Sequence, residues 1–365
     1  MKKIISTAAA VLAFSMAFAD VSVEFTQAGY LSSDRGGKSV KLDVNGYDDD
    51  KKVTGCVVTE ISNEFAGVVF DFDPYIKDVG RDYVDNANNK MFDQYYGWVN
   101  FMGGKAKLQS GVWASRSVNR MKKDAGSWEK SEYEAFKPGV INGTIADDVT
   151  NLTEGNLSTQ ITYSLDNGYA KAAIVSSDYG ASSLKSGFAL EGGFNINEDT
   201  NVKVYFKNLK DQEIAFAVFG ESTGLKEGLD LVAGFTAGNA KTESGFEYAL
   251  DVRARYELND KIAFTTMNNV SSAFSSVKNE DVYALWDMLS VAYKLSDKTK
   301  LTVTGEWYYE DLSEEKSGAL SIIPGITYSP CDGADITTGL ILETTGWKKP
   351  STSSISIPVV LHVAL

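Results

Sequence analysis

Charged residues recur at every second position in several segments of the chain. In residues 246–258 one parity is apolar or aromatic, and every charge falls on the other parity. Period two is the repeat of a β-strand, whose successive side chains point to opposite faces. A face that carries charges of both signs can orient dipolar solutes and select among ions, as rings of charge do in pores. The chemistry that this pattern suggests is therefore electrostatic and not covalent.

Two further segments, residues 201–207 and 299–309, repeat the pattern. Together the three segments predict these charged, lumen-facing, pore-lining side chains: Lys203, Lys207, Glu247, Asp251, Arg253, Arg255, Lys300 and Glu306. Their placement follows from alternation alone. The alternative for the two arginines is that they pair along the wall with neighbouring carboxylates and contact no solute.

The longest break between such segments covers residues 116–156. Cations cluster at its start and carboxylates near its end: Arg116, Arg120, Lys122, Lys123, Asp147, Asp148 and Glu154. Long loops without secondary structure are usually functional or disordered. We expect this loop to fold into the pore as a constriction with opposed charges. The alternative is a solvated external loop whose charges only keep it in water.

The sequence offers no group of residues suited to catalysis or metal binding. His362 is the single histidine, and Ser356 lies about 20 Å away along the same strand, too far for a nucleophile–base pair. The acidic and amide-rich runs at 48–50 and 85–89 lack the ligand spacing of a calcium loop. We therefore expect no enzymatic activity, no metal and no cofactor.

The first nineteen residues have the features of a secretory signal. Lys2 and Lys3 precede an apolar stretch at 4–16, and residues 17–19, Ala-Phe-Ala, form a small-x-small cleavage site. We expect cleavage after Ala19, so that 1–19 is the signal peptide and 20–365 the mature barrel. The net charge is −14, and −16 without the two lysines, which argues against nucleic acid as a partner.

Cys56 and Cys331 are the only cysteines. Two cysteines are too few for the disulfide framework of a small secreted domain. We expect both thiols to be free, although a single bridge between them is left open.

The candidate residues lie on a repeating unit of about ten residues that alternates apolar with polar and ends in a turn-rich break. This unit is typical of a transmembrane β-barrel, although the strands of a β-sandwich alternate too. We count eighteen such strands in an all-β, antiparallel up-and-down barrel, with sixteen as the alternative. Bacterial barrels have even strand numbers, so residues 40–44 are placed in the first outer loop.

The breaks between strands alternate between short and generally longer ones when counted from the C-terminus. Short periplasmic turns and longer external loops are the arrangement of outer-membrane barrels. The last segment, 354–365, has one uninterrupted apolar face. We expect this strand to be the one through which the barrel-assembly machinery recognises the chain.

Two residues disturb the alternation, and we predict a β-bulge at each. Pro358 cannot donate a hydrogen bond to a strand ladder, and a closed barrel has no free edge to place it on. Asp287 would face lipid if its strand, 282–294, continued without a bulge.

One hairpin carries a family resemblance. Residues 94–101, Gln-Tyr-Tyr-Gly-Trp-Val-Asn-Phe, are followed by a glycine turn and then by residues 105–111, Lys-Ala-Lys-Leu-Gln-Ser-Gly. This hairpin resembles one in the porin-like proteins of spirochaetes, and residues 61–67, Ile-Ser-Asn-Glu-Phe-Ala-Gly, are similar to the N-terminal half of the same family. The resemblance covers about a fifth of the chain. It implies an outer-membrane channel without identifying a solute.

These observations predict a passive, porin-like channel for small hydrophilic solutes or ions, surrounded by outer-membrane lipid. Four aromatic residues fit the girdles at the two membrane interfaces: Tyr95, Trp98, Trp307 and Tyr309. The alternative is a surface adhesin or antigen on a barrel scaffold. The state of assembly is open between a monomer and a homotrimer.

Overall fold

The computed structural model of the protein describes residues 19–34, 40–43, 53–72, 92–113, 157–176, 186–209, 212–239, 246–275, 280–309, 311–312, 318–345 and 352–364. All regular secondary structure in these residues is β-strand. Within the same ranges there is no helix long and apolar enough to traverse a bilayer.

The strands in chain order are β1 (Ala19–Asp34), β2 (Val40–Asp43), β3 (Val53–Ser62), β4 (Ala66–Phe72), β5 (Phe92–Phe101), β6 (Ala106–Val112), β7 (Leu157–Leu165), β8 (Gly168–Ser176), β9 (Ser186–Asn197), β10 (Thr200–Leu209), β11 (Gln212–Ser222), β12 (Leu229–Asn239), β13 (Phe246–Glu257), β14 (Ile262–Ser275), β15 (Glu280–Ser296), β16 (Thr299–Tyr309), β17 (Gly318–Cys331), β18 (Ala334–Gly339), β19 (Ile341–Thr345) and β20 (Thr352–Ala364).

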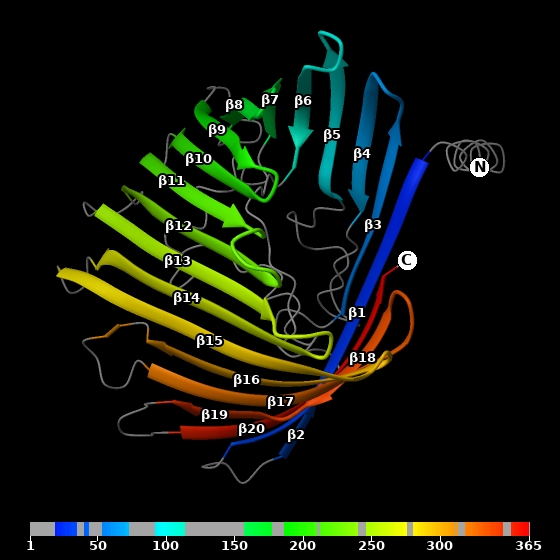
Figure 1. Cartoon of the computed structure of the whole chain (residues 1–365), viewed down its shortest axis with the longest axis vertical. Helices are drawn as coiled ribbons and strands as arrows, with labels where there is room; N and C mark the ends of the chain where they lie inside the picture. The colour runs from blue at the N-terminus through cyan, green and yellow to red at the C-terminus, as the bar shows by residue number, and fades with distance from the viewer. Residues whose placement is uncertain are drawn as a thin grey trace, which may run out of the picture.

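The strands form one closed antiparallel sheet, seen as a ring of arrows in Figure 1. Neighbours in the chain are neighbours in the wall from β3 to β17. The ring closes where β20 pairs with β1 and β1 pairs with β3. Each position around the ring is paired with the positions on both sides of it, so the barrel is closed.

Two positions in the wall each hold two collinear strands. β2 and β3 lie end to end along one side of β1, and β18 and β19 lie end to end between β17 and β20. The twenty strands of the described residues therefore occupy eighteen positions. The prediction of an eighteen-stranded up-and-down barrel is confirmed, and the alternative of sixteen is wrong.

The placement of residues 40–44 in a loop is wrong. Val40–Asp43 is strand β2, whose residues pair with β1 between Tyr30 and Ser33. The pairing of β1 with β3 ends at Gln27, so the far end of β1 needs another partner for its backbone groups. β2 supplies it, and because β2 continues the position of β3 the strand number stays even.

The bulge predicted at Pro358 is also wrong. The register of β20 with β1 is continuous through Pro358, and the irregularity lies instead in the next strand, which breaks at Leu340 between β18 and β19. The registers place Leu340 opposite Pro324 of β17 and Gly339 opposite Pro358. Two neighbouring prolines lack the N–H groups that this stretch needs, so the ladder lapses there without a change of register.

The third correction concerns Asp287. The registers of β15 with β14 and β16 are continuous through this residue, which pairs with Asn268 on one side and Trp307 on the other. The only register shift in these ladders falls between Lys294 and Ser296, at the end of the strand. Asp287 therefore keeps the parity of Leu285 and Leu289, on the outer face of the wall.

The tight turns gather at one end of the barrel, called here the turn end. They join β3 to β4, β5 to β6 and each later pair through β17 and β18, as the short breaks in the sequence predict. The start of β1 and the end of β20 lie at the same end. In the turn after β5, Gly103 and Gly104 have φ angles of 66° and 85°, which glycine adopts without steric cost.

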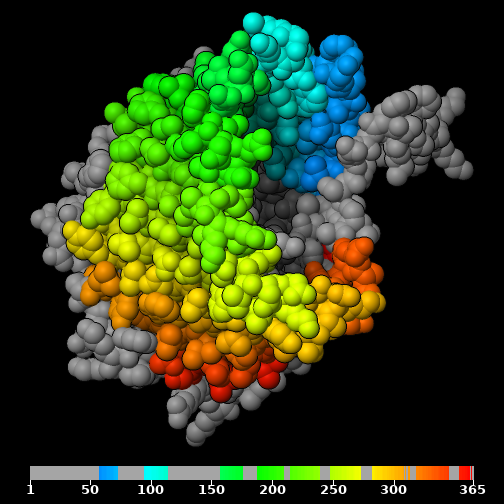
Figure 2. Space-filling model, in the orientation of Figure 1, coloured from blue at the N-terminus to red at the C-terminus, as the bar shows by residue number. Residues whose placement is uncertain are grey.

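The two faces of the wall differ in composition. Alternate strand residues are exposed and apolar, for example Phe70, Ile161, Leu190, Val218, Leu250, Val303 and Ile357. The residues between them are buried and mostly polar or small. Figure 2 shows the continuous outer surface of the green to orange strands and a recess between them and the blue and cyan strands.

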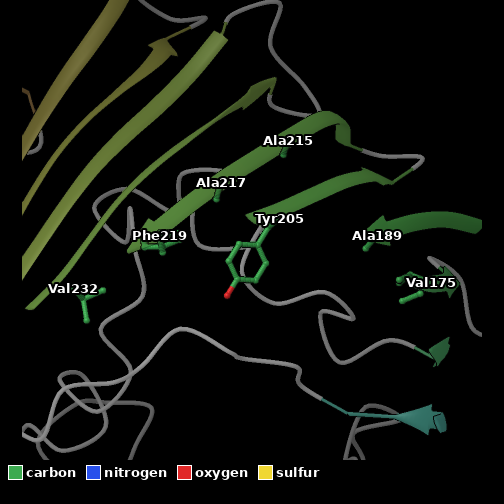
Figure 3. Close-up of a cluster of buried hydrophobic side chains, with 8 residues drawn as sticks. Val175, Ala189, Tyr205, Ala215, Ala217, Phe219 and Val232 are labelled. Carbon is green, nitrogen blue, oxygen red and sulfur yellow. The ribbon is translucent and has the colours of Figure 1, made fainter. Parts of the chain in front are cut away.

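The inner face of β8 to β12 also carries an apolar cluster. Figure 3 shows Tyr205 of β10 and Phe219 of β11 pointing to the inside of the barrel, with their rings in an edge-on contact at 6.2 Å. Ala189, Ala215 and Ala217 surround them, and each is fully buried. Small side chains leave room for the two rings on a concave wall. The cluster fixes the strands that carry the charged residues described next.

Candidate functional site: the charged inner wall

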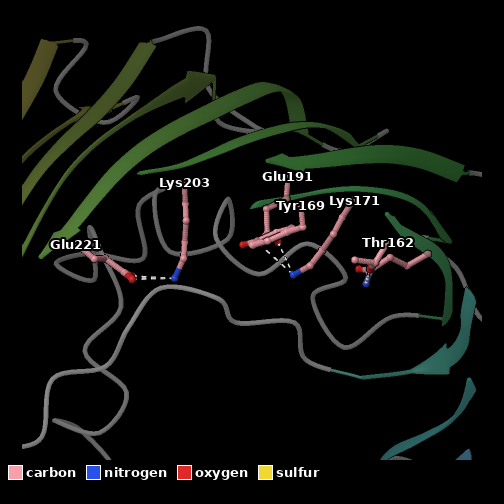
Figure 4. A network of polar contacts seen from close by, with 7 residues as sticks. Thr162, Tyr169, Lys171, Glu191, Lys203 and Glu221 are labelled. Carbon is pink, nitrogen blue, oxygen red and sulfur yellow. Dashed lines mark hydrogen bonds and ion pairs between the residues drawn. The ribbon is translucent and has the colours of Figure 1, made fainter. Parts of the chain in front are cut away.

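The inner face of β8 and β9 carries a compact polar network, drawn in Figure 4. The strand register places Lys171 directly opposite Glu191, and the lysine Nζ donates to both carboxylate oxygens at 3.1 Å. The hydroxyl of Tyr169 donates to the same carboxylate, and Nζ of Lys171 lies 4.8 Å from the centre of the tyrosine ring. Glu191 is therefore held by a cation and a hydroxyl at once.

A second ion pair lies on β10 and β11. Nζ of Lys203 contacts both carboxylate oxygens of Glu221, at 3.0 and 2.9 Å. The residues Glu191 and Glu221 are only 3% and 6% exposed. A buried charge is costly unless a counter-charge and hydrogen bonds compensate it, and both carboxylates meet that condition.

The neighbouring wall, β13 and β14, has a third group of inward polar residues. Nδ2 of Asn269 donates to Oδ1 of Asp251 at 2.8 Å, and both side chains are buried. Arg253 lies two residues along on the same face and is 1% exposed. The charged sector of the inner wall therefore extends from β8 to β14.

The middle of β15 to β18 is different, because hydroxyl groups replace charges there. Thr304 donates to Ser290 at 2.9 Å, and Thr327 and Thr337 share a hydrogen bond of 3.0 Å. All four side chains are buried. The inner wall therefore carries more charge from β8 to β14 than in the middle of β15 to β18, where neutral threonines separate Lys300 from Glu306, so the field across the interior is uneven.

All eight residues predicted from alternation have the inward parity. Asp251, Arg253, Lys207 and Glu247 are buried, and the other four are partly buried. The structure brings Lys203 to Glu221, and Arg255 to Glu257 at the turn end. The second pair matches the wall-pairing alternative for one arginine. The seven residues predicted for a constriction, Arg116 to Glu154, lie outside the described residues.

One aromatic residue was assigned to the wrong face. Trp98 faces inward, where its Nε1 donates to Glu60 at 3.2 Å and Lys107 lies 4.5 Å from its ring centre. Tyr95 is exposed on the opposite face. The two are three positions apart on one strand, so period two prevents both from facing lipid. Trp307 is exposed on the outer face, as expected.

The network residues Tyr169, Lys171, Glu191 and Glu221 were not singled out from the sequence. Each lies on the polar parity of its strand, so the alternation that identified Lys203 marks these residues too. What the alternation cannot supply is the cross-strand register that brings Lys171 opposite Glu191. Register depends on the turns and on both neighbouring strands.

A glycine makes room for this network and supports a testable prediction. Gly193 lies opposite Tyr169, and a Cβ added to it would lie 2.2 Å from Cε1 of the tyrosine ring. Gly193→Ala should therefore destabilise the barrel by about 1–3 kcal/mol, the usual effect of overpacking. Gly192→Ala is the matched control, since nothing lies within 4 Å of its Cβ position. The stability of both variants can be measured by urea titration, with the folded fraction read from gel mobility without boiling. Equal urea midpoints for the two variants would contradict the close packing of Gly193 against Tyr169.

Comparison with solved structures finds similar folds among outer-membrane channels. OccK3 (OpdO) of Pseudomonas aeruginosa has a TM-score of 0.57 at 10% identity, with 95% of each chain covered. The outer membrane channel DcaP of Acinetobacter baumannii has a TM-score of 0.53 at 9% identity, covering 96% of this chain and 99% of that one. An anion-selective porin from Comamonas acidovorans has a TM-score of 0.50 at 10% identity, covering 95% and 100%. No family model and no curated protein matches the sequence.

Proposed function

We propose that the chain forms a passive, porin-like channel in an outer membrane, for small hydrophilic solutes or ions. The observation that carries this proposal is the division of a closed eighteen-position barrel into an apolar outer face and a charged inner face. An apolar outer face suits lipid, and barrels of sixteen to eighteen strands are wide enough to hold an aqueous bore. The structural likeness to outer-membrane channels supports the fold on which the proposal stands.

The inner wall would act on solutes through its field. Lys171 and Lys203 each face a carboxylate, so a passing solute meets both signs of charge within one sector. Dipolar molecules orient in such a field, and ions are admitted according to the balance of the two signs. No step in this mechanism forms or breaks a covalent bond.

Several finer statements belong to the same proposal. Residues 1–19 serve as the export signal, and the last strand contacts the assembly machinery. The charges from Arg116 to Glu154 narrow the pore. The kinship with spirochaete porin-like proteins rests on the hairpin at 94–111 alone. Amino-terminal sequencing of the exported protein checks the first of these, since Asp20 should be the first residue.

Liposome swelling tests the proposed function and its charge dependence. The purified chain, refolded into phospholipid vesicles, should admit small sugars and amino acids faster than empty vesicles do. Glu191→Gln combined with Glu221→Gln should raise the entry of anionic over cationic solutes at least about five-fold, the factor that one such charge gives for one ion. One unit charge about 4 Å from an ion changes its energy by about 1 kcal/mol in water, and 1.4 kcal/mol is a factor of ten. Swelling identical to that of empty vesicles would contradict the channel; unchanged discrimination would contradict the role of the two carboxylates.

A further inference from the structure

The outer face of the wall carries a cluster of three linked polar side chains, which we call the outer polar patch: Thr266 and Asn268 of β14 and Asp287 of β15. Among the outward-facing strand side chains that the structure describes, Asp287 is the one that carries a charge. Its neighbours on the same face of β15 are Leu285 and Leu289. The patch therefore lies inside an apolar surface and not at its rim.

Hydrogen bonds join the three side chains of the patch. Nδ2 of Asn268 donates to Oδ1 of Asp287 at 2.6 Å. The hydroxyl of Thr266 donates to Oδ1 of Asn268 at 3.1 Å. The three groups are partly covered and partly exposed on the outside of the barrel.

The depth of the patch follows from the strand geometry. Asp287 precedes Lys294, which is near the turn end of β15, by seven residues. At about 3.3 Å per residue and a tilt near 45°, this places the carboxylate roughly 16 Å above the turn end. The apolar band of such barrels is about 25 Å tall, so the patch would face the hydrocarbon interior. A carboxylate there lacks the water that normally solvates it.

The patch has hydrogen-bonding capacity left over. The Asn268 carboxamide has two N–H groups and donates one of them to Asp287, whose second carboxylate oxygen accepts no hydrogen bond from a described residue. The patch thus offers one donor and one acceptor to its surroundings. Lipid chains can satisfy neither group.

Of the outer-wall surfaces that the structure describes, the patch of a second copy complements the remaining donor and acceptor best. Two other outward pairs of polar side chains, Ser110 with Thr159 and Thr200 with Ser222, are each closed by their own hydrogen bond, of 2.9 and 2.8 Å. Small residues flank the patch: Ala254 pairs with Thr266, and Gly305 pairs with Leu289. They allow a second backbone to approach closely.

We propose that the outer polar patch is the contact between two copies of this chain, related by a two-fold axis along the membrane normal. Copies inserted in the same direction can meet only at equal depth, and a two-fold axis brings the patch onto itself. Asn268 of each copy then donates its second N–H to Asp287 of the other. This pairing favours a dimer over the homotrimer considered from the sequence. The inference rests on the proposed membrane position of the wall and not on conduction.

Cysteine cross-linking tests the two-fold contact directly. Val270→Cys, beside Asn268 on the outward face of β14, is made in the full chain with Cys56→Ser and Cys331→Ser, refolded into phosphatidylcholine vesicles and oxidised with copper-phenanthroline. A disulfide-linked dimer should form at least ten times more than in the control Val218→Cys on β11, since Val270 and Val218 are both 40% exposed. Equal yields at the two positions, or none at Val270→Cys, would overturn the proposal.

A second variant tests the contact without an introduced cysteine. Asn268→Leu with Asp287→Leu makes the patch apolar, so the pair should separate into monomers by native mass spectrometry in detergent, with the heat-dependent gel shift intact. A dimer that persists in this variant would overturn the proposal. Loss of the heat-dependent shift in the unaltered chain would instead overturn the membrane barrel itself, and the dimer with it.

Discussion

Gly111→Ala is expected to prevent most of the chain from reaching the folded barrel. Gly111 has a φ of 138°, a region that L side chains rarely adopt. Its added Cβ would lie 2.4 Å from the carbonyl oxygen of Tyr95 and 2.6 Å from Cα of Tyr96. Backbone atoms cannot rotate away as a side chain can. The strain costs about 1–3 kcal/mol, and overpacking adds about 1–3 kcal/mol.

Gly97→Ala is the matched control in the same hairpin. The nearest atom to its Cβ position, the carbonyl oxygen of Gly67, is 3.7 Å away, which is an ordinary contact. The yield of heat-modifiable protein after refolding into detergent should fall sharply for Gly111→Ala and stay at the wild-type level for Gly97→Ala. Equal yields would show that β6 can shift relative to β5. Gly111 is also the last residue of the 105–111 segment that carries the sequence resemblance, and the close approach of β5 is a physical reason for glycine there.

Lys171→Met is expected to destabilise the barrel by about 3–5 kcal/mol, the usual cost of breaking a buried ion pair from one side. The side chain of Glu191 is fully buried and that of Lys171 is 18% exposed. Without the lysine, the carboxylate retains the Tyr169 hydroxyl as a hydrogen-bond donor (Figure 4). Adding Glu191→Gln should recover most of the loss, because a neutral amide needs no counter-charge.

The exposed pair of Lys294 and Asp297 provides the comparison. Its side chains are 50% and 97% exposed, and its Nζ to Oδ1 distance of 3.0 Å is similar to that of the buried pair. The hydrogen bond from Lys294 lowers the pKa of the Asp297 carboxyl. Exposed pairs contribute little to stability, so Lys294→Met should leave the urea midpoint unchanged. If both lysine variants shifted the midpoint equally, burial of the Glu191 network would be contradicted.

Much of the fold could be predicted because a barrel strand has a simple code. Alternation identified the strands, and turn length identified the end at which they reverse. The parity of Arg253 and Lys203 followed directly. The wrong predictions concern backbone hydrogen bonds between strands. β2 pairs with the part of β1 that β3 does not reach. The break at Leu340 is caused by prolines in the two neighbouring strands. Neither cause is visible within the segment that it affects.

Asp287 shows the limit of reasoning from one strand. A carboxylate in an apolar face suggested a bulge that would turn it inward, but the register is continuous. The compensating partner is Asn268, on the neighbouring strand. The same holds for the inner wall, where parity predicts which charges face inward and only register decides that Lys171 meets Glu191. The pairs that form across strands in the candidate site could therefore not be predicted from the sequence.

The charged inner wall should surround a conducting path, and single-channel recording can detect such a path, with the purified full chain added to a planar phospholipid bilayer in potassium chloride. We expect discrete current steps of uniform size. In Glu191→Gln with Glu221→Gln, we expect a reversal potential shifted toward anion selectivity. If the bilayer stays silent while the same preparation shows the heat-dependent gel shift of a folded barrel, the inner wall does not conduct.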